Sequence, residues 1–159
     1  MNRAISRALV LGLLVAVASV GVTLATSGSG ASPTTLGRGT LEAGDKIKND
    51  NLKLDVRTDI DVVTQTITIV PGGHTGWHSH PGPVFVTITA GAMTFYDGDD
   101  PACAPIVYPT GSTFIDEGGG HVHIARNQGT VNLVLYATLL LPVGAGLRTD
   151  APDPGNCPA

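Results

Sequence analysis

The feature that most constrains the fold is a series of short β-branched and aromatic segments separated by glycine and proline turns. The 21 glycines and 11 prolines suit a chain dense in turns, and no segment has a convincing helical pattern. Short strands at spacings of about 8–12 residues predict an all-β sandwich or barrel. Residues 34–54 are less regular and predict an edge strand or two and a loop around residues 46–51. The other expected strands cover residues 61–70, 84–89, 93–96, 106–108, 112–115, 121–124 and 131–141.

The first 31 residues have the composition of an export signal. Residues 1–7 carry two arginines and no acidic residue, and an apolar or small-residue run follows from residue 8 to about residue 25. These are the parts of a secretory signal peptide, and small residues would allow cleavage after Ala25 or after Ala31. An uncleaved membrane anchor is the alternative, because the run is at the short end for a membrane span. We therefore expect a secreted or cell-envelope protein.

The rest of the chain has the size of one domain. We expect N-terminal edge strands and a loop over residues 32–60, a barrel core over residues 61–142 and a C-terminal tail over residues 143–159. The formal net charge of the whole chain is −4, without a basic stripe, which argues against nucleic-acid binding. No later apolar segment is long enough for a bilayer, so no membrane contact is expected after signal cleavage.

Two cysteines agree with export. Cys103 and Cys157 each lie in a loop rich in proline, glycine or aspartate. Outside the cytoplasm such a pair most simply forms one disulfide, which here would join the C-terminal tail to a loop. The alternative is two unpaired thiols.

All five histidines lie in two glycine-rich segments. They are His74, His78, His80, His121 and His123. Residues two apart on a strand point to the same face, so His78 and His80 should project together, as should His121 and His123. Neutral imidazoles converging from two strands are suitable ligands for a transition metal. The clustering therefore predicts a metal site more readily than core packing.

Both histidine segments resemble the two sequence motifs of the cupin superfamily. Residues 72–91 contain glycine, five residues, H-x-H and a closing glycine, and residues 118–127 contain glycine, two residues, histidine, three residues and asparagine. The chain is similar to a small, single-domain, exported cupin of the actinobacterial type, over about residues 62–142. The resemblance implies a double-stranded β-helix, or jelly-roll, barrel with an internal metal, and allows a homodimer.

The sequence departs from the cupin pattern at one metal ligand. The glutamate of the first motif is replaced by Val84, which cannot bind a metal. Val84 and Val86 should form an apolar pocket wall. The resemblance then implies one divalent transition metal ion (Fe, Zn, Mn, Cu or Ni) on His78, His80 and His123, with water or substrate completing the coordination.

Other side chains could make up for the missing acid. His121 or His74 could be a fourth ligand or a general acid–base, since imidazole titrates near neutral pH. Asp116 and Glu117 precede the second motif and could supply a carboxylate, although a solvated turn is the expected role. Trp77 alternates with its histidine neighbour and should pack away from the metal.

These observations favour an exported metal-binding cupin with a histidine-only site. Its function would be a metal-dependent, dioxygenase-like oxidoreductase reaction on a small molecule. The alternative is a non-catalytic module that binds a small ligand or the metal alone. The missing glutamate separates the two, because it weakens any assignment to reactions that need that acid. Since one fold supports many reactions, the substrate stays open.

Overall fold

Alternating burial along two long strands builds the barrel wall. In β11 (Leu133–Pro142) every second residue from Leu133 to Leu141 is buried, while the residues between them are half-buried or exposed. In β6 (Val84–Ala90) the buried positions are Val84, Val86 and Ile88. Successive side chains of a strand point to opposite faces. Each strand therefore turns one apolar face toward a common interior.

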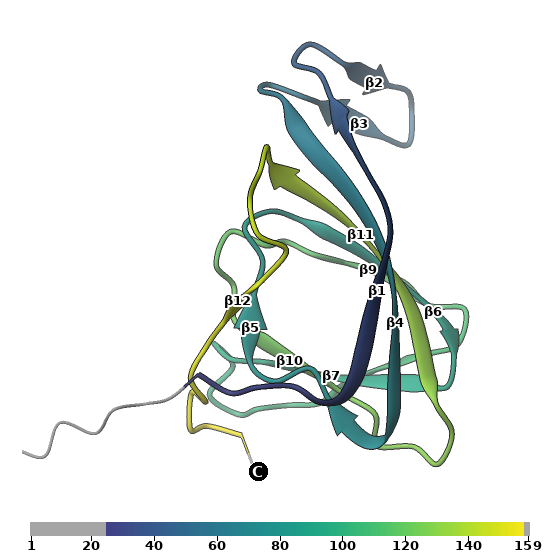
Figure 1. The fold of residues 1–159 in the computed structure, drawn as a ribbon, viewed down its shortest axis with the longest axis vertical. Helices are drawn as coiled ribbons and strands as arrows, with labels where there is room; N and C mark the ends of the chain where they lie inside the picture. The colour runs from purple at the N-terminus through teal and green to yellow at the C-terminus, as the bar shows by residue number, and fades with distance from the viewer. Residues whose placement is uncertain (1–24, 158–159) are drawn as a thin grey trace, which may run out of the picture.

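The computed structural model describes residues 25–157 and shows a nearly closed antiparallel β-barrel (Figure 1). Strand β4 (Ile60–His74) pairs with β1 (Ser29–Leu41) along one edge and with β11 along the other. Strand β11 then pairs with β6, and β6 pairs with β9 (Thr113–Asp116). These long ladders form one side of the barrel.

Shorter strands form the other side. Strand β10 (His123–Arg126) pairs with the end of β4, with β7 (Ala92–Asp97) and with β5 (His78–Ser79). Strand β7 also pairs with β8 (Ile106–Pro109), and β5 pairs with β12 (Thr149–Asp150). The predicted all-β barrel is confirmed, and each strand expected from residue 61 onward overlaps an observed one.

A hairpin replaces the loop expected around residues 46–51. Strands β2 (Lys46–Lys48) and β3 (Lys53–Asp55) pair with each other and stand away from the barrel (Figure 1). The side chain of Asn49 accepts hydrogen bonds from the backbone N–H groups of Asn51 and Leu52. This side-chain capping closes the turn, which the scattered polar residues did not reveal.

The segment before β1 is tied into the barrel. The backbone N–H of Thr26 donates to the carbonyl of Ala151 at 2.9 Å, and its hydroxyl accepts from the N–H of Trp77 at 2.7 Å. Strand β1 begins at Ser29, two residues before the predicted end of the signal at residue 31. Residues 1–24 of that predicted signal lie outside the described residues. Within residues 25–157, no helix has the length and hydropathy needed to cross a bilayer.

The predicted disulfide joins Cys103 to Cys157, with 5.2 Å between their Cα atoms. Beside it, the Asn156 amide donates to the carbonyls of Gly98 and Asp100. The C-terminal tail is therefore fixed against the loop between β7 and β8.

Two apolar clusters fill the molecule. The larger one lies inside the long strands, and the smaller one contains Trp77, Ile124 and Ala151. Trp77 is only 1% exposed and packs in the smaller cluster, as its alternation with His78 predicted. The larger cluster consists of Val63, Ile69, Val84, Val86, Ile88, Met93, Phe95, Ala125, Leu133, Leu135, Ala137, Leu139 and Leu141.

Candidate metal centre

Three histidines meet at one end of the barrel interior. His78 begins β5 and His123 begins β10, and the two are direct cross-strand partners. His80 lies just beyond β5. The ring centroids of His78 and His123 are 4.4 Å apart, and those of His78 and His80 are 4.9 Å apart. One nitrogen from each ring lies within 4.8 Å of the other two. The predicted ligands are thus brought together.

Each of these rings is oriented by a backbone carbonyl. The Nδ1 atom of His78 lies 2.9 Å from the carbonyl oxygen of Gly76, and that of His80 lies 2.7 Å from the oxygen of Leu147. The Nδ1 atom of His123 is 3.3 Å from the oxygen of His121. A carbonyl can only accept, so Nδ1 carries the proton and Nε2 keeps its lone pair. Metal-binding histidines are commonly held in this way.

A glycine turn fixes the first of these contacts. Gly76 has a φ of +72°, in the left-handed region that favours glycine. A Cβ atom here would lie 2.3 Å from the carbonyl oxygen of Thr26. The turn before β5 is therefore tight and packed against the N-terminal segment, and it directs the Gly76 carbonyl at the His78 ring.

Burial keeps the three imidazoles neutral. It lowers the pKa of His78 to about 2, with further lowering by the neighbouring His123, Arg148 and His80. Burial also lowers the pKa of His80, and it lowers that of His123 to about 4. At neutral pH these rings carry no proton on Nε2 and can donate electron pairs to a metal.

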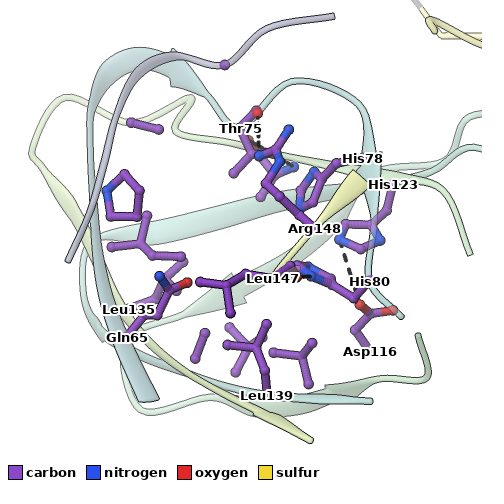
Figure 2. Close-up of a pocket in the computed structure, with 18 of the residues that line it drawn as sticks. Gln65, Thr75, His78, His80, Asp116, His123, Leu135, Leu139, Leu147 and Arg148 are labelled. Carbon is purple, nitrogen blue, oxygen red and sulfur yellow. Dashed lines mark hydrogen bonds and ion pairs between the residues drawn. The ribbon is translucent and has the colours of Figure 1, made fainter. Parts of the chain in front are cut away.

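Asp116 is a site residue that the sequence interpretation misplaced. It was expected in a solvated turn, but it is the last residue of β9 and its side chain is only 2% exposed. Its Oδ2 atom lies 3.8 Å from Nε2 of His123 and 4.0 Å from Nε2 of His80 (Figure 2). Glu117, next in the chain, is exposed as expected. Asp116 is buried because it is the cross-strand partner of Val84 and its side chain lies on the inward face of β9.

His121 lies beside the triad and contacts two carboxylates. Strand β10 begins only at His123, so His121 belongs to the preceding turn and not to the strand expected from residue 121. Its Nε2 is 3.0 Å from Asp97, and its Nδ1 is 3.4 Å from Oδ1 of Asp116. Burial alone lowers the pKa of His121, but the hydrogen bonds and charges of the two aspartates outweigh it and raise that pKa. His121 is therefore the most readily protonated of these rings.

His74 is placed apart from the other four histidines. It ends β4, and its Nδ1 accepts a hydrogen bond from the N–H of Gly76 at 3.1 Å. It is absent from the groups of side chains that could share a metal ion among the described residues. Its contacts support the turn that leads into β5.

The triad opens into a cavity of about 520 Å³. The predicted wall residues Val84 and Val86 line it, together with apolar side chains from β4, β7 and β11. Arg148 lies on the histidine side (Figure 2). Its Nη1 donates to the carbonyl of Thr75 at 2.9 Å, and its guanidinium pairs with Asp150. One end of the cavity is therefore polar and the other is apolar.

The residues present fit a transition metal ion. Three neutral imidazoles with free Nε2 atoms are a donor set suited to Zn, Fe, Cu or Ni. A buried carboxylate oxygen without a hydrogen-bond partner among the described residues, Oδ2 of Asp116, lies within 4.0 Å of Nε2 of both His80 and His123. A buried polar atom without a partner is costly, so a cation here would stabilise the site.

Comparisons with known proteins identify the fold. No protein-family model and no curated protein sequence matches the chain. Among solved structures, an uncharacterized conserved protein with a double-stranded β-helix domain from Klebsiella pneumoniae is 20% identical. The match covers 76% of this chain and 84% of that one, with a TM-score of 0.51. A cupin-like protein from Thermotoga maritima is 21% identical over 58% of this chain and 65% of that one, with a TM-score of 0.50. The barrel that carries the histidine triad therefore has the cupin fold.

Proposed function

We propose that this protein binds one divalent transition metal ion through His78, His80 and His123 and takes up a small molecule beside it. The observation that carries the proposal is the convergence of one nitrogen from each of three histidine rings, while a backbone carbonyl holds Nδ1 of each ring. The metal, when bound, would supply a Lewis acid or a redox centre. The chain's own residues would hold the rings neutral and keep the inner end of the cavity dry.

The cavity favours a ligand with an apolar body and an anionic group. Val86, Leu139 and Phe114 line the apolar end, and Arg148 offers a positive charge near the histidines. The guanidinium forks toward Asp150, so an incoming carboxylate would compete with that exposed partner. We infer that small carboxylic acids bind better than their neutral amides.

Metal analysis by mass spectrometry tests the proposal. Purified untagged protein should hold close to one transition-metal ion per chain, and His78→Ala or His123→Ala should lose it. His74→Asn is the matched control and should keep the metal, because the His74 ring lies outside the triad and the Asn side chain can still accept a hydrogen bond from the N–H of Gly76. Unchanged metal content in both triad variants would refute the site. Calorimetric titration of the metal-loaded protein with carboxylic acid and amide pairs, repeated with Arg148→Gln, tests the ligand class.

An oxidoreductase is the catalytic form of this proposal. The cavity reaches the triad, so a substrate has access to metal positions that three protein ligands leave open. Dioxygen uptake by the iron-loaded protein with the acids that bind would support catalysis. Ligand binding without uptake under any metal would favour the non-catalytic alternative.

We also propose that the chain is exported and cleaved after Ala25. Cleavage after Ala31 would remove Thr26, whose contacts hold Trp77 and Ala151, and the start of β1. Cleavage after Ala25 keeps all of these, and the disulfide suits an oxidising compartment. The intact mass of exported protein should correspond to a chain beginning at Thr26 with no free thiols. A chain beginning at Ser32 would contradict this cleavage site.

A further inference from the structure

We propose that Asp116 is a fourth, anionic ligand of the metal, reaching the histidine triad from β9. This inference rests on the metal function proposed above and deepens it. It concerns a carboxylate that the sequence places outside the H-x-H segment. The residue lies on a neighbouring strand, 32 positions beyond Val84 in the chain.

One carboxylate oxygen of Asp116 is buried without a partner. Oδ1 of Asp116 accepts from the N–H of Gly118 at 3.3 Å and faces Nδ1 of His121 at 3.4 Å. Oδ2 is buried and has no hydrogen-bond partner within residues 25–157. Buried polar atoms in native proteins are nearly always paired, so Oδ2, one of three such unpaired atoms among the described residues, needs an explanation, and a bound ion is one.

That oxygen lies close to nitrogens of two triad histidines. Oδ2 lies 4.0 Å from Nε2 of His80 and 3.8 Å from Nε2 of His123, too far for hydrogen bonds. Two atoms that share a metal, each bound at about 2.0–2.2 Å, lie roughly 3–4 Å apart. Both oxygen–nitrogen distances are therefore compatible with pairs of ligands on one ion.

Neither of these two histidines can donate a hydrogen bond to Oδ2 of Asp116. In a neutral imidazole only one ring nitrogen carries a proton. His80 and His123 direct Nδ1 at carbonyl oxygens, so their Nε2 atoms have no proton to donate to Asp116. His121, the ring that can donate, faces Oδ1 instead of Oδ2. A cation between Oδ2 and the two Nε2 atoms satisfies all three acceptors.

The backbone holds Asp116 in place. Val84 and Asp116 are direct cross-strand partners of β6 and β9, so the carboxylate enters beside the apolar side chain of Val84. Two residues after Asp116, Gly118 has a φ of +67°, and a Cβ there would lie 2.1 Å from the carbonyl oxygen of Gly82. The turn is thus packed closely against the segment that joins His80 to Val84.

A carboxylate changes the kind of ion expected. Three imidazoles alone form a neutral donor set, whereas three imidazoles with Asp116 carry one negative charge. An anionic oxygen ligand favours Zn(II), Fe(II) or Mn(II) over Cu(I), which prefers soft donors. We therefore expect the site to bind a divalent ion more tightly than Cu(I).

Substitution of the charge alone tests this assignment. In Asp116→Asn, Zn(II) affinity measured by competition with a chromophoric chelator should fall at least about 10-fold, the lower end of the loss that is typical when even an outer-shell partner of a metal ligand is removed. The visible absorption bands of the Co(II)-loaded protein should also shift. Glu117→Gln is the matched control, because it removes an adjacent exposed carboxylate and should leave both readouts unchanged. Wild-type affinity and an unshifted Co(II) spectrum in Asp116→Asn would overturn the proposal.

A second measurement uses the wild-type protein, in case Asp116→Asn does not fold. Infrared difference spectra on Zn(II) binding should show a shift in a carboxylate stretching band. The absence of any carboxylate change would overturn the assignment. The outcomes also separate the two proposals. If His78→Ala loses the metal but Asp116→Asn behaves as wild type, only the Asp116 assignment fails; if wild-type protein binds no metal, both fail.

Discussion

The two walls of the cavity are built in different ways. The apolar wall rests on β6 and β11, which pair along a nearly continuous ladder. The histidine wall rests on β5, which has two residues, and on β10, which has four. Tethers from distant parts of the chain hold this second wall, including the N–H of Ala151 bonded to the carbonyl of Trp77 and the Cys103–Cys157 disulfide. The apolar wall is therefore stabilised by its own strand pairing, while the histidine wall depends on contacts with distant parts of the chain.

Removal of the disulfide should have the largest effect on this difference. Cys103→Ser/Cys157→Ser opens a loop of 54 residues, which corresponds to about 4 kcal/mol of unfolding free energy in the chain-entropy estimate. Because the tail supports the histidine wall, metal affinity should fall as well. Urea denaturation and metal titration measure the two effects. Equal urea midpoints for the variant and the wild type would show that the disulfide does not stabilise the folded protein.

A truncation in the apolar wall should lower stability and spare the metal. Leu139 is 1% exposed and lines the cavity. Leu139→Ala should lower the unfolding free energy by about 2–3 kcal/mol, toward the lower part of the range for such changes because one side of the residue already faces open space. Metal content should stay at the wild-type level. Loss of metal from folded Leu139→Ala would show that the walls are coupled.

Acidification should destabilise the histidine wall. The pKa of His78 is about 2 in the folded protein and 6.5 in a free chain. Between these values the unfolded chain binds a proton that the folded protein does not, so stability falls as pH falls below 6.5. His78 should contribute about 1.4 kcal/mol per pH unit in the metal-free protein. Urea midpoints at several pH values should therefore show a shallower slope in His78→Ala; parallel slopes would argue against a ring held neutral by burial.

The long strands could be predicted because their signal is local. In β6 and β11 a run of mostly apolar, β-branched or aromatic residues marks the strand, and alternation counted from His80 gives the inward face of β6. The triad could be predicted for a similar reason, since His78 and His123 lie in compact glycine-rich motifs. The Cys103–Cys157 pair followed from composition and the export pattern.

The environments of Asp116 and His121 could not be predicted in the same way. Asp116 is buried because β9 pairs with β6, a contact between segments far apart in the sequence. His121 was assigned to a strand by its spacing from His123, but the three glycines before it adopt positive φ values and delay the strand. Local spacing describes which residues share a strand face only after the strand ends are known.

The cross-strand pair of Val84 and Asp116 has a consequence for how such sites are recognised. Neighbouring strands bring residues 84 and 116 to the same height on the barrel wall. A side chain at either position therefore reaches the same part of the barrel wall, although the two positions lie far apart in the sequence. A search for the first motif alone finds no acidic residue at position 84. A search that also considers paired positions on neighbouring strands finds Asp116 beside it.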